Sequence, residues 1–129
     1  MSCCCGSKGC CNTCNNFTIS QSLTANATNS TLTINTNLTS IDNNEQVCIC
    51  VAQNIPDGVT SQYQVLININ GTNYNFIDRN GHYVYGDQIC SRKVYCMRYA
   101  ADSKMFIYNG CYKLKRSAHV IAPETTPAV

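Results

Sequence analysis

Apolar and polar residues alternate over several short stretches of this chain, and a period of two residues is typical of a half-buried β-strand. In residues 30–38, Leu32, Ile34 and Leu38 fall on one side of such a strand, with polar residues opposite. The same pattern predicts further strands at 17–24, 45–52, 64–69, 72–77, 88–99, 105–108 and 111–114, with 117–122 as a candidate last strand. No stretch shows the period of an α-helix, so the sequence predicts an all-β fold.

Asn-Gly pairs mark the tightest predicted turns, because a type I′ hairpin needs positive φ at both central positions. With Asn70-Gly71 as a two-residue loop, Ile67 faces Tyr74 and Val65 faces Phe76. A shift of one residue would place these apolar side chains on opposite faces, so this register is well specified.

Two further Asn-Gly pairs predict two further hairpins. Asn80-Gly81 sets Ile77 opposite Val84 and makes a three-stranded meander, and Asn109-Gly110 joins the strands on either side of it. Many short strands with frequent turns indicate a single-domain β-sandwich, and within that class a jelly roll. We expect a Cys-rich N-terminal connector over residues 1–15, a β-sandwich body over 16–122 and a C-terminal tail over 123–129.

Cysteine is the residue type that stands out in the composition, with eleven copies in 129 residues. Six of them fall in the connector, whose other residues are mostly Gly, Ser and Asn and which has no hydrophobic period of its own: Cys3, Cys4, Cys5, Cys10, Cys11 and Cys14. The other five lie in the body, at Cys48, Cys50, Cys90, Cys96 and Cys111. Cys48 and Cys50 share one face of their predicted strand, and Cys90 and Cys96 share one face of theirs. Because the total is odd, one thiol must be free or bonded to another chain.

Charge is scarce, at 12% of residues and a formal net charge of +2. Low charge favours a subunit that packs against copies of itself, and +2 is too small to indicate a nucleic-acid partner. The basic residues gather late in the sequence: Arg92, Lys93, Arg98, Lys104, Lys113, Lys115 and Arg116. We interpret them as the solvated face of two strands, with a patch for an anionic partner, such as an acidic face of the next copy, as the alternative. We expect no membrane partner, because no apolar run is long enough to span a bilayer.

The first residues do not have the pattern of a secretory signal peptide. Eleven cysteines are nevertheless more than is usual for a cytosolic protein with reduced thiols. The sequence therefore predicts synthesis in a cytoplasm and later exposure to oxidant, outside the cell or after lysis.

Little in the sequence indicates catalysis or a cofactor. The two histidines, His82 and His119, have no neighbouring nucleophile motif, and there is no glycine-rich loop for a phosphate. The carboxylates lie mostly in or beside predicted turns, where they accept backbone hydrogen bonds. We therefore expect a protein that is not an enzyme and that holds no cofactor.

The cysteines of the connector allow four interpretations. They can cross-link to other subunits, since adjacent thiols on an extended chain point to different partners. They can form a thiolate metal cluster, since Cys-Cys and Cys-x-x-Cys spacings suit zinc or copper. Palmitoylation at Cys3, Cys4 and Cys5 is a third interpretation, and an inert tail is the fourth.

The stretch Gly9-Cys10-Cys11-Asn12-Thr13-Cys14, followed by a small all-β body with further cysteines, resembles the subunits of bacterial endospore appendages. In that family of pilus-like fibres, a jelly-roll body stacks into helical fibres, and an N-terminal connector reaches earlier subunits and joins them by disulfides. The resemblance implies that Cys10, Cys11 and Cys14 form intersubunit disulfides. Cys3, Cys4 and Cys5 are additional candidates, and the five body cysteines are candidates to receive them.

The sequence thus predicts a structural subunit of an extracellular or spore-surface fibre, built from helical or symmetric copies of itself and fastened by disulfides. A phage or virion component, such as a capsid, decoration or tail protein, is the alternative that also fits a symmetric assembly of one chain. A thiol-rich metal-binding protein is the third.

Overall fold

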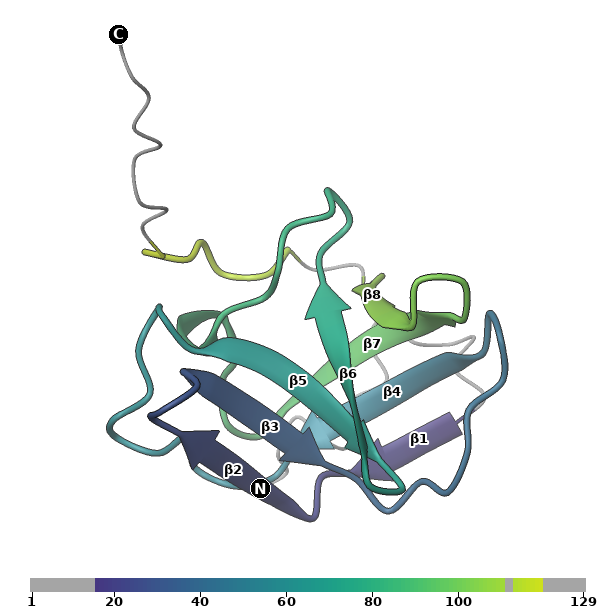
Figure 1. Cartoon of the computed structure of the whole chain (residues 1–129), viewed down its shortest axis with the longest axis horizontal. Helices are drawn as coiled ribbons and strands as arrows, with labels where there is room; N and C mark the ends of the chain where they lie inside the picture. The colour runs from purple at the N-terminus through teal and green to yellow at the C-terminus, as the bar shows by residue number, and fades with distance from the viewer. Residues whose placement is uncertain (1–15, 111–112, 120–129) are drawn as a thin grey trace, which may run out of the picture.

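The computed structural model describes residues 16–110 and 113–119, and these form a curled, mixed sheet of eight strands with one short 3-10 turn (Figure 1). The strands are β1 (Asn16–Ile19), β2 (Ser22–Asn26), β3 (Thr31–Asn35), β4 (Gln46–Val51), β5 (Gln64–Ile69), β6 (Thr72–Ile77), β7 (Lys93–Ala100) and β8 (Met105–Tyr108), and the 3-10 turn is η2 (Gly86–Gln88). There is no α-helix in the described part of the chain, which confirms the all-β prediction. Residues 15 and 122, where the predicted connector and the predicted body end, both lie outside the described residues.

Within residues 16–110 and 113–119, no helix has the length and apolar character needed to cross a membrane.

The order of strands across the sheet is β1-β4-β7-β8-β6-β5-β3-β2. Seven strand pairs join the eight strands of this order, and three of these pairs are parallel: β1 with β4, β3 with β5, and β6 with β8. Figure 1 shows β2, β3 and β5 side by side, with β1 and β4 at the other end of the sheet. Parallel neighbours need a crossover connection, so these pairings join segments far apart in the sequence.

The two edge strands, β1 and β2, are joined by only two residues, and this short link makes the sheet curl. The Ser20 N–H donates to the Cys50 carbonyl at 2.8 Å, and the Gln21 N–H donates to the Asn35 carbonyl at 2.8 Å. One residue of the link thus pairs with β4 and the next with β3. Ser20 is buried and its hydroxyl accepts the Ala52 N–H at 3.0 Å, which fixes the position of the bend.

The single strand predicted over 17–24 was therefore wrong, because the chain divides there into two strands at opposite edges. Phe17, Ile19 and Leu23 keep the period of two on either side of the bend, so these apolar positions alone do not reveal it. The local signal in the sequence is the polar run Ser20-Gln21-Ser22, which interrupts the alternation where the chain bends.

The core lies on the concave side of the curled sheet and takes apolar side chains from β3 to β8. Its fully buried members include Leu32, Ile34, Val47, Ile49, Val51, Val65, Ile67, Phe76, Met97 and Phe106. The core also includes the aromatic rings of Tyr95, Tyr99 and Tyr108, which are slightly more exposed than these residues. All these residues occupy alternate positions of their strands, as the period of two predicts.

The hairpin around Asn70-Gly71 has the predicted register. Ile67 lies opposite Tyr74 and Asn68 opposite Asn73, and Ile67 is 0% exposed. Asn70 and Gly71 have φ of 51° and 86°, the conformation that a type I′ turn requires.

The second predicted hairpin differs by one residue. Ile77 pairs with Tyr83 in an isolated bridge, not with Val84, and residues 83–85 form no regular strand. The Asp78 N–H donates to the His82 carbonyl at 2.8 Å, which makes the loop one residue longer than the Asn-Gly pair alone. The longer loop turns Val84 towards the core, where it is 0% exposed.

Two other strand predictions were wrong in part. The strand predicted over 88–99 begins only at Lys93, because residues 86–88 form η2 and Arg92 takes a φ of 61°. The hairpin predicted at Asn109-Gly110 is not seen, since β8 already has β7 and β6 as neighbours on its two sides. Residues 113–119 are not in a strand, and the remaining parts of the predicted strands 111–114 and 117–122 lie outside the described residues.

Candidate functional site: a thiol-lined face of the sheet

Strand β4 is buried on both of its faces, unlike an ordinary strand of a sheet that covers one core. Val47, Ile49 and Val51 point into the core cluster. Cys48 and Cys50 point to the opposite, convex side, yet they are 1% and 0% exposed. The convex side of this part of the sheet is therefore not an ordinary solvated face.

The neighbours of these two cysteines follow from strand register. In the parallel pair, Phe17 lies beside Cys48 and Ile19 beside Cys50. In the antiparallel pair with β7, Cys96 lies opposite Cys48 and Val94 opposite Cys50. We call these six side chains the thiol face: Phe17, Ile19, Cys48, Cys50, Val94 and Cys96.

Apolar side chains of the thiol face are exposed at the edge of the sheet. Phe17 is 49% exposed and Ile19 is 50% exposed, and with Tyr83 they are the exposed large hydrophobic residues of the described chain. Both belong to β1, an edge strand of the described sheet. An edge strand without charge and with apolar side chains favours association with another chain or segment.

Sulfur atoms of the thiol face are close to one another. The Sγ atoms of Cys48 and Cys96 lie 2.6 Å apart, in the buried centre of the face. Cys48, Cys50 and Cys96 are each disulfide-bonded, whereas Cys90 is the free cysteine among the described residues. The face thus brings together three of the five cysteines that the sequence indicated as receivers.

The remaining candidates lie elsewhere. Cys90 is not on a strand: it follows η2, is half-buried, and its N–H donates to the Tyr95 hydroxyl at 2.7 Å. The prediction that Cys90 and Cys96 share a strand face was therefore wrong, because β7 begins at Lys93. Cys111 and the six connector cysteines, Cys3, Cys4, Cys5, Cys10, Cys11 and Cys14, lie outside the described residues.

Phe17 and Ile19 were not recognised as part of a site from the sequence. Their alternation predicts a strand, but their position beside Cys48 and Cys50 depends on parallel pairing between segments about thirty residues apart. The sequence does contain one indication that β4 has covered neighbours: both faces of residues 47–51 are apolar, which is typical of a strand covered on two sides.

The convex face of β2, β3, β5 and β6 is different in kind, because it carries a polar ladder. Asn35 Nδ2 donates to Ser22 Oγ at 3.0 Å and to Thr24 Oγ1 at 2.9 Å. Asn68 Nδ2 donates to Asn73 Oδ1 at 2.8 Å. These neutral groups satisfy one another across the strands, so the two convex faces divide the molecule into a polar side and a thiol side.

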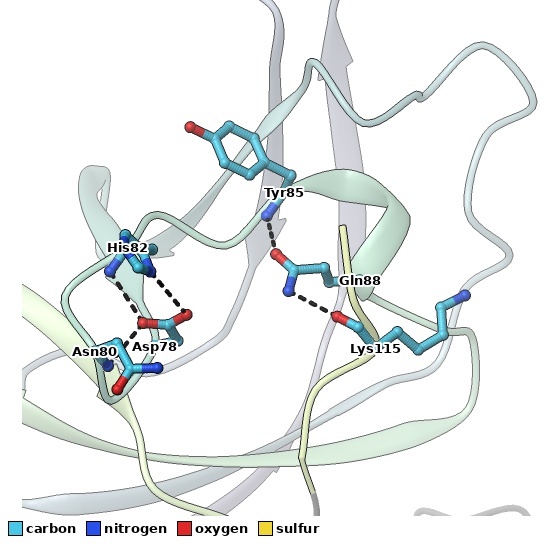
Figure 2. Close-up of polar contacts among 6 residues, drawn as sticks. All are labelled: Asp78, Asn80, His82, Tyr85, Gln88 and Lys115. Carbon is cyan, nitrogen blue, oxygen red and sulfur yellow. Dashed lines mark hydrogen bonds and ion pairs between the residues drawn. The ribbon is translucent and has the colours of Figure 1, made fainter. Parts of the chain in front are cut away.

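The histidines take part in turn and loop contacts. In Figure 2, Asp78 accepts the N–H groups of Asn80 and His82, at 2.8 and 2.9 Å, and its other oxygen lies 3.8 Å from His82 Nδ1. His119 stacks on the Tyr85 ring with centroids 3.7 Å apart, and its Nδ1 lies 3.0 Å from the Ser61 carbonyl. Both histidines are thus held by neighbouring turns.

A short strap, residues 113–119, crosses the 3-10 turn. Figure 2 shows Gln88 accepting the Tyr85 N–H and donating its Nε2 to the Lys115 carbonyl, at 2.9 and 2.8 Å. Asp87 accepts the Ser117 hydroxyl and the Ala118 N–H, both at 2.7 Å. The strap is therefore attached mainly by polar side chains of η2.

None of the six side chains of the thiol face belongs to a Lys, Arg, His, Asp, Glu or Tyr residue. The nearest arginines by sequence bind neutral amides: Arg98 donates to Asn44 at 2.9 Å and Arg92 to Asn54 at 3.4 Å. In the described part of the chain, no three side chains of His, Cys, Asp or Glu form a group that could hold a metal ion. The chemistry that this face offers is that of sulfur in an apolar setting.

Comparison of the chain with protein-family models, with curated proteins and with solved structures gave no match. The resemblance to endospore appendage subunits therefore rests on the connector residues and the all-β body alone.

Proposed function

We propose that this protein is a structural subunit of an extracellular or spore-surface fibre. Copies of the chain associate in a helical or symmetric homo-oligomer, and disulfides formed by the N-terminal connector fasten one copy to another. The observation that most supports this proposal is the thiol face, where three cysteines lie on the same face as the exposed apolar side chains of edge strand β1.

Chain connectivity supports this proposal. The connector leads directly into β1, and Cys14 is two positions before Asn16. A connector of fifteen residues can span at most roughly 50 Å when extended, which exceeds the distance across several strands at about 4.8 Å each. Its cysteines can therefore reach the thiol face of a neighbouring copy.

A sulfur atom of this face that already has a partner can still take part in disulfide exchange. Thiol–disulfide exchange replaces one sulfur partner by another, so a connector from another copy can displace an earlier partner of Cys48, Cys50 or Cys96. We infer that these three, with Cys111, receive Cys10, Cys11 and Cys14, and that Cys3, Cys4 and Cys5 add further links. Cys90 lies before the first residue of β7 and away from the thiol face, so it is the least suitable of the five as a receiver.

We also infer that the curled sheet is a flattened β-sandwich of the jelly-roll type. Two groups of neighbouring strands, β1-β4-β7-β8 and β6-β5-β3-β2, would form its layers. Core residues from both groups pack in one cluster, and the two-residue link between β1 and β2 carries the chain from one layer to the other. This arrangement supports the proposal because each layer then has one core face and one outer face available for assembly.

The proposal is tested by electron microscopy of purified protein after air oxidation. The full chain should form fibres that survive heating in detergent and dissolve when a thiol reductant is added. A variant without residues 1–14 should give folded monomers or short, fragile oligomers, and Cys10→Ser/Cys11→Ser/Cys14→Ser is the matched control that keeps the connector. Long, detergent-resistant fibres of the deletion variant would refute the role of the connector.

A further inference from the structure

The three Asn-Gly pairs of the chain differ in how the fold holds the asparagine side chain. Asn-Gly is the dipeptide at which an asparagine loses its amide most readily, because glycine has no Cβ and its N–H can approach the neighbouring side chain. This local chemistry is the same at Asn70, Asn80 and Asn109. Differences in reactivity among the three must therefore come from the fold.

The side chain of Asn109 is held by a second amide. Gln46 Nε2 donates to Asn109 Oδ1 at 2.8 Å, and Asn109 Nδ2 donates to Gln46 Oε1 at 3.0 Å. The backbone N–H of Asn109 donates to the Cys96 carbonyl at 2.9 Å. Gly110 is buried and lies against the Tyr108 ring. Within the described residues no acceptor holds the Gly110 N–H, so the side-chain pair and the burial of Gly110 are what restrain this site.

Asn70 and Asn80 lack such a restraint. Both are exposed, and so are Gly71 and Gly81. Within residues 16–110 and 113–119, neither of the two side-chain amides makes a hydrogen bond, and Figure 2 shows Asn80 joined to Asp78 through its backbone N–H alone. A Cβ at Gly71 or Gly81 would meet nothing within 4 Å. Each side-chain carbonyl carbon can therefore rotate freely towards the next backbone nitrogen.

The attacking nitrogens of these two sites are only lightly held. The Gly71 N–H donates to Asn68 Oδ1 at 3.3 Å, which is longer than the usual range of roughly 2.7–3.2 Å. The Gly81 N–H donates to the Asp78 carbonyl at 3.1 Å. Each is a single bond in an exposed turn, and water can replace its acceptor at small net cost.

We propose that Asn70 and Asn80 are sites of hydrolytic deamidation, and that the amide pair with Gln46 protects Asn109. Water is the co-reactant, and the reaction proceeds without an enzyme, a metal ion or an oxidant. The inference does not rest on the proposed function, because it follows from the contacts of the three turns alone.

The reaction balances in two steps. The glycine nitrogen loses its proton and attacks the side-chain carbonyl carbon of the asparagine, so a new C–N bond forms and the bond from that carbon to the side-chain nitrogen breaks. The departing nitrogen takes up a proton and leaves as ammonia. Water then adds to either carbonyl of the cyclic imide and opens it to aspartate or isoaspartate. Overall, one water molecule is consumed and one ammonia is released at each site.

Deamidation changes the charge of the whole molecule and the backbone of one turn. Each conversion adds one negative charge, so conversion at both sites takes the formal net charge from +2 to zero, the value at which association of copies is least opposed. Aspartate suits position 70, because Asp-Gly also forms type I′ turns. Isoaspartate instead lengthens the main chain by one carbon in the loop between the paired residues Ile69 and Thr72.

The test incubates the full, folded chain at mildly alkaline pH in water enriched in heavy oxygen, which labels each newly formed carboxylate. The same chain, reduced and unfolded in urea, is the reference. Peptide mapping by mass spectrometry follows amide loss at the three sites. In the folded chain, Asn70 and Asn80 should react about tenfold faster than Asn109, because two amide hydrogen bonds must break before Asn109 can react. In urea the three rates should be similar.

Gln46→Ala removes the amide pair and should raise the rate at Asn109 towards that at Asn70. Gln64→Ala is the matched control, because Gln64 is also the first residue of a six-residue strand and also donates to an asparagine, Asn75, at 2.8 Å. It should leave all three rates unchanged, since Asn75 is not followed by glycine.

Two results in the unaltered folded chain would overturn the inference. One is amide loss at Asn109 as fast as at Asn70 and Asn80. The other is the absence of amide loss at Asn70 and Asn80 while the urea reference reacts. Unchanged protection of Asn109 in a folded Gln46→Ala chain would overturn the role of the amide pair. If Gln46→Ala does not fold, the comparison of the folded and unfolded unaltered chain decides the question on its own.

Discussion

Single residues of β4 and β5 show how position decides the role of an apolar side chain. Ile49 and Cys48 are neighbours and both are buried, but Ile49 packs in the core and Cys48 lies on the convex side. In β5, Ile67 is buried in the core while Leu66, on the convex side, is half-buried. Substitutions at such adjacent positions should therefore have very different costs.

Replacing Ile67 by Asn places an amide in the core with no partner for its hydrogen bonds. We expect the free energy of unfolding to fall by about 2–4 kcal/mol, because the side chain is 0% exposed. Leu66→Asn is the control on the same strand and should cost about 1 kcal/mol or less. Urea unfolding followed by circular dichroism gives both values, and equal costs would contradict the assigned faces of β5.

The buried phenol of Tyr95 predicts a loss of stability at alkaline pH. Burial raises the pKa of Tyr95 well above its usual value, partly offset by the hydrogen bond from the Cys90 N–H. Because the pKa is higher in the folded than in the unfolded state, the stabilisation is complete below about pH 10 and is lost as the pH rises further. Burial raises the pKa of Tyr99 and Tyr108 also, so they act in the same direction.

The measurement is urea unfolding at several pH values from about 8 to 11. Tyr95→Phe should lose less stability over this range than the unaltered chain, although it should start about 1 kcal/mol lower because the Cys90 N–H loses its acceptor. Identical pH dependence of the two proteins would show that Tyr95 does not carry the effect.

At the scale of elements, local turn chemistry and non-local pairing differ in how well the sequence predicts them. The Asn70-Gly71 hairpin was predicted with its register because both strands and their turn lie within fourteen residues. The parallel pairs of β1 with β4 and of β6 with β8 were not predicted, because no turn residue specifies them. The Asn80-Gly81 turn shows the limit of the local signal, since Asp78 extends that loop by one residue.

The same distinction explains what was predicted of the candidate site. The shared face of Cys48 and Cys50 follows from the period of one strand and is confirmed by the register. The position of Cys96 opposite Cys48, and that of Phe17 beside it, requires knowledge of which strands are neighbours. Cys90 was placed on the wrong element because the strand was predicted to begin at Gln88, whereas residues 86–88 form a 3-10 turn and residues 91–92 a further turn before β7.

The strap over residues 113–119 offers a test at the scale of one element. Asp87→Ala removes the acceptor of the Ser117 hydroxyl and of the Ala118 N–H, and bonds to a charged group are worth about 1.5–3 kcal/mol each before solvent screening. Because Asp87 is only half-buried, we expect a total loss of about 1–2 kcal/mol and faster hydrogen exchange at Ala118. Asp57→Ala, in an exposed turn, is the control and should leave exchange at Ala118 unchanged. Unchanged exchange in Asp87→Ala would contradict the attachment of the strap through η2.

At the scale of the whole molecule, the two convex faces differ in chemistry. The polar ladder of β2, β3, β5 and β6 satisfies its own hydrogen bonds, whereas the thiol face combines buried sulfur with exposed apolar side chains on an edge strand. A molecule with so little charge has little self-repulsion to oppose association of such faces. Once disulfides join the copies, dissociation requires reduction of a covalent bond, and the stability of the assembly becomes a matter of rate.

The central claim, that connector cysteines of one copy bond to the thiol face of another, is tested most directly by isotope mixing. Equal amounts of unlabelled and ¹⁵N-labelled protein are mixed while reduced, oxidised together, digested without reductant and mapped by mass spectrometry. We predict that linked peptides joining Cys10, Cys11 or Cys14 to Cys48, Cys50, Cys96 or Cys111 contain one labelled and one unlabelled partner in about half of the cases. Links found only between peptides of the same label, or only among the connector cysteines themselves, would contradict the account.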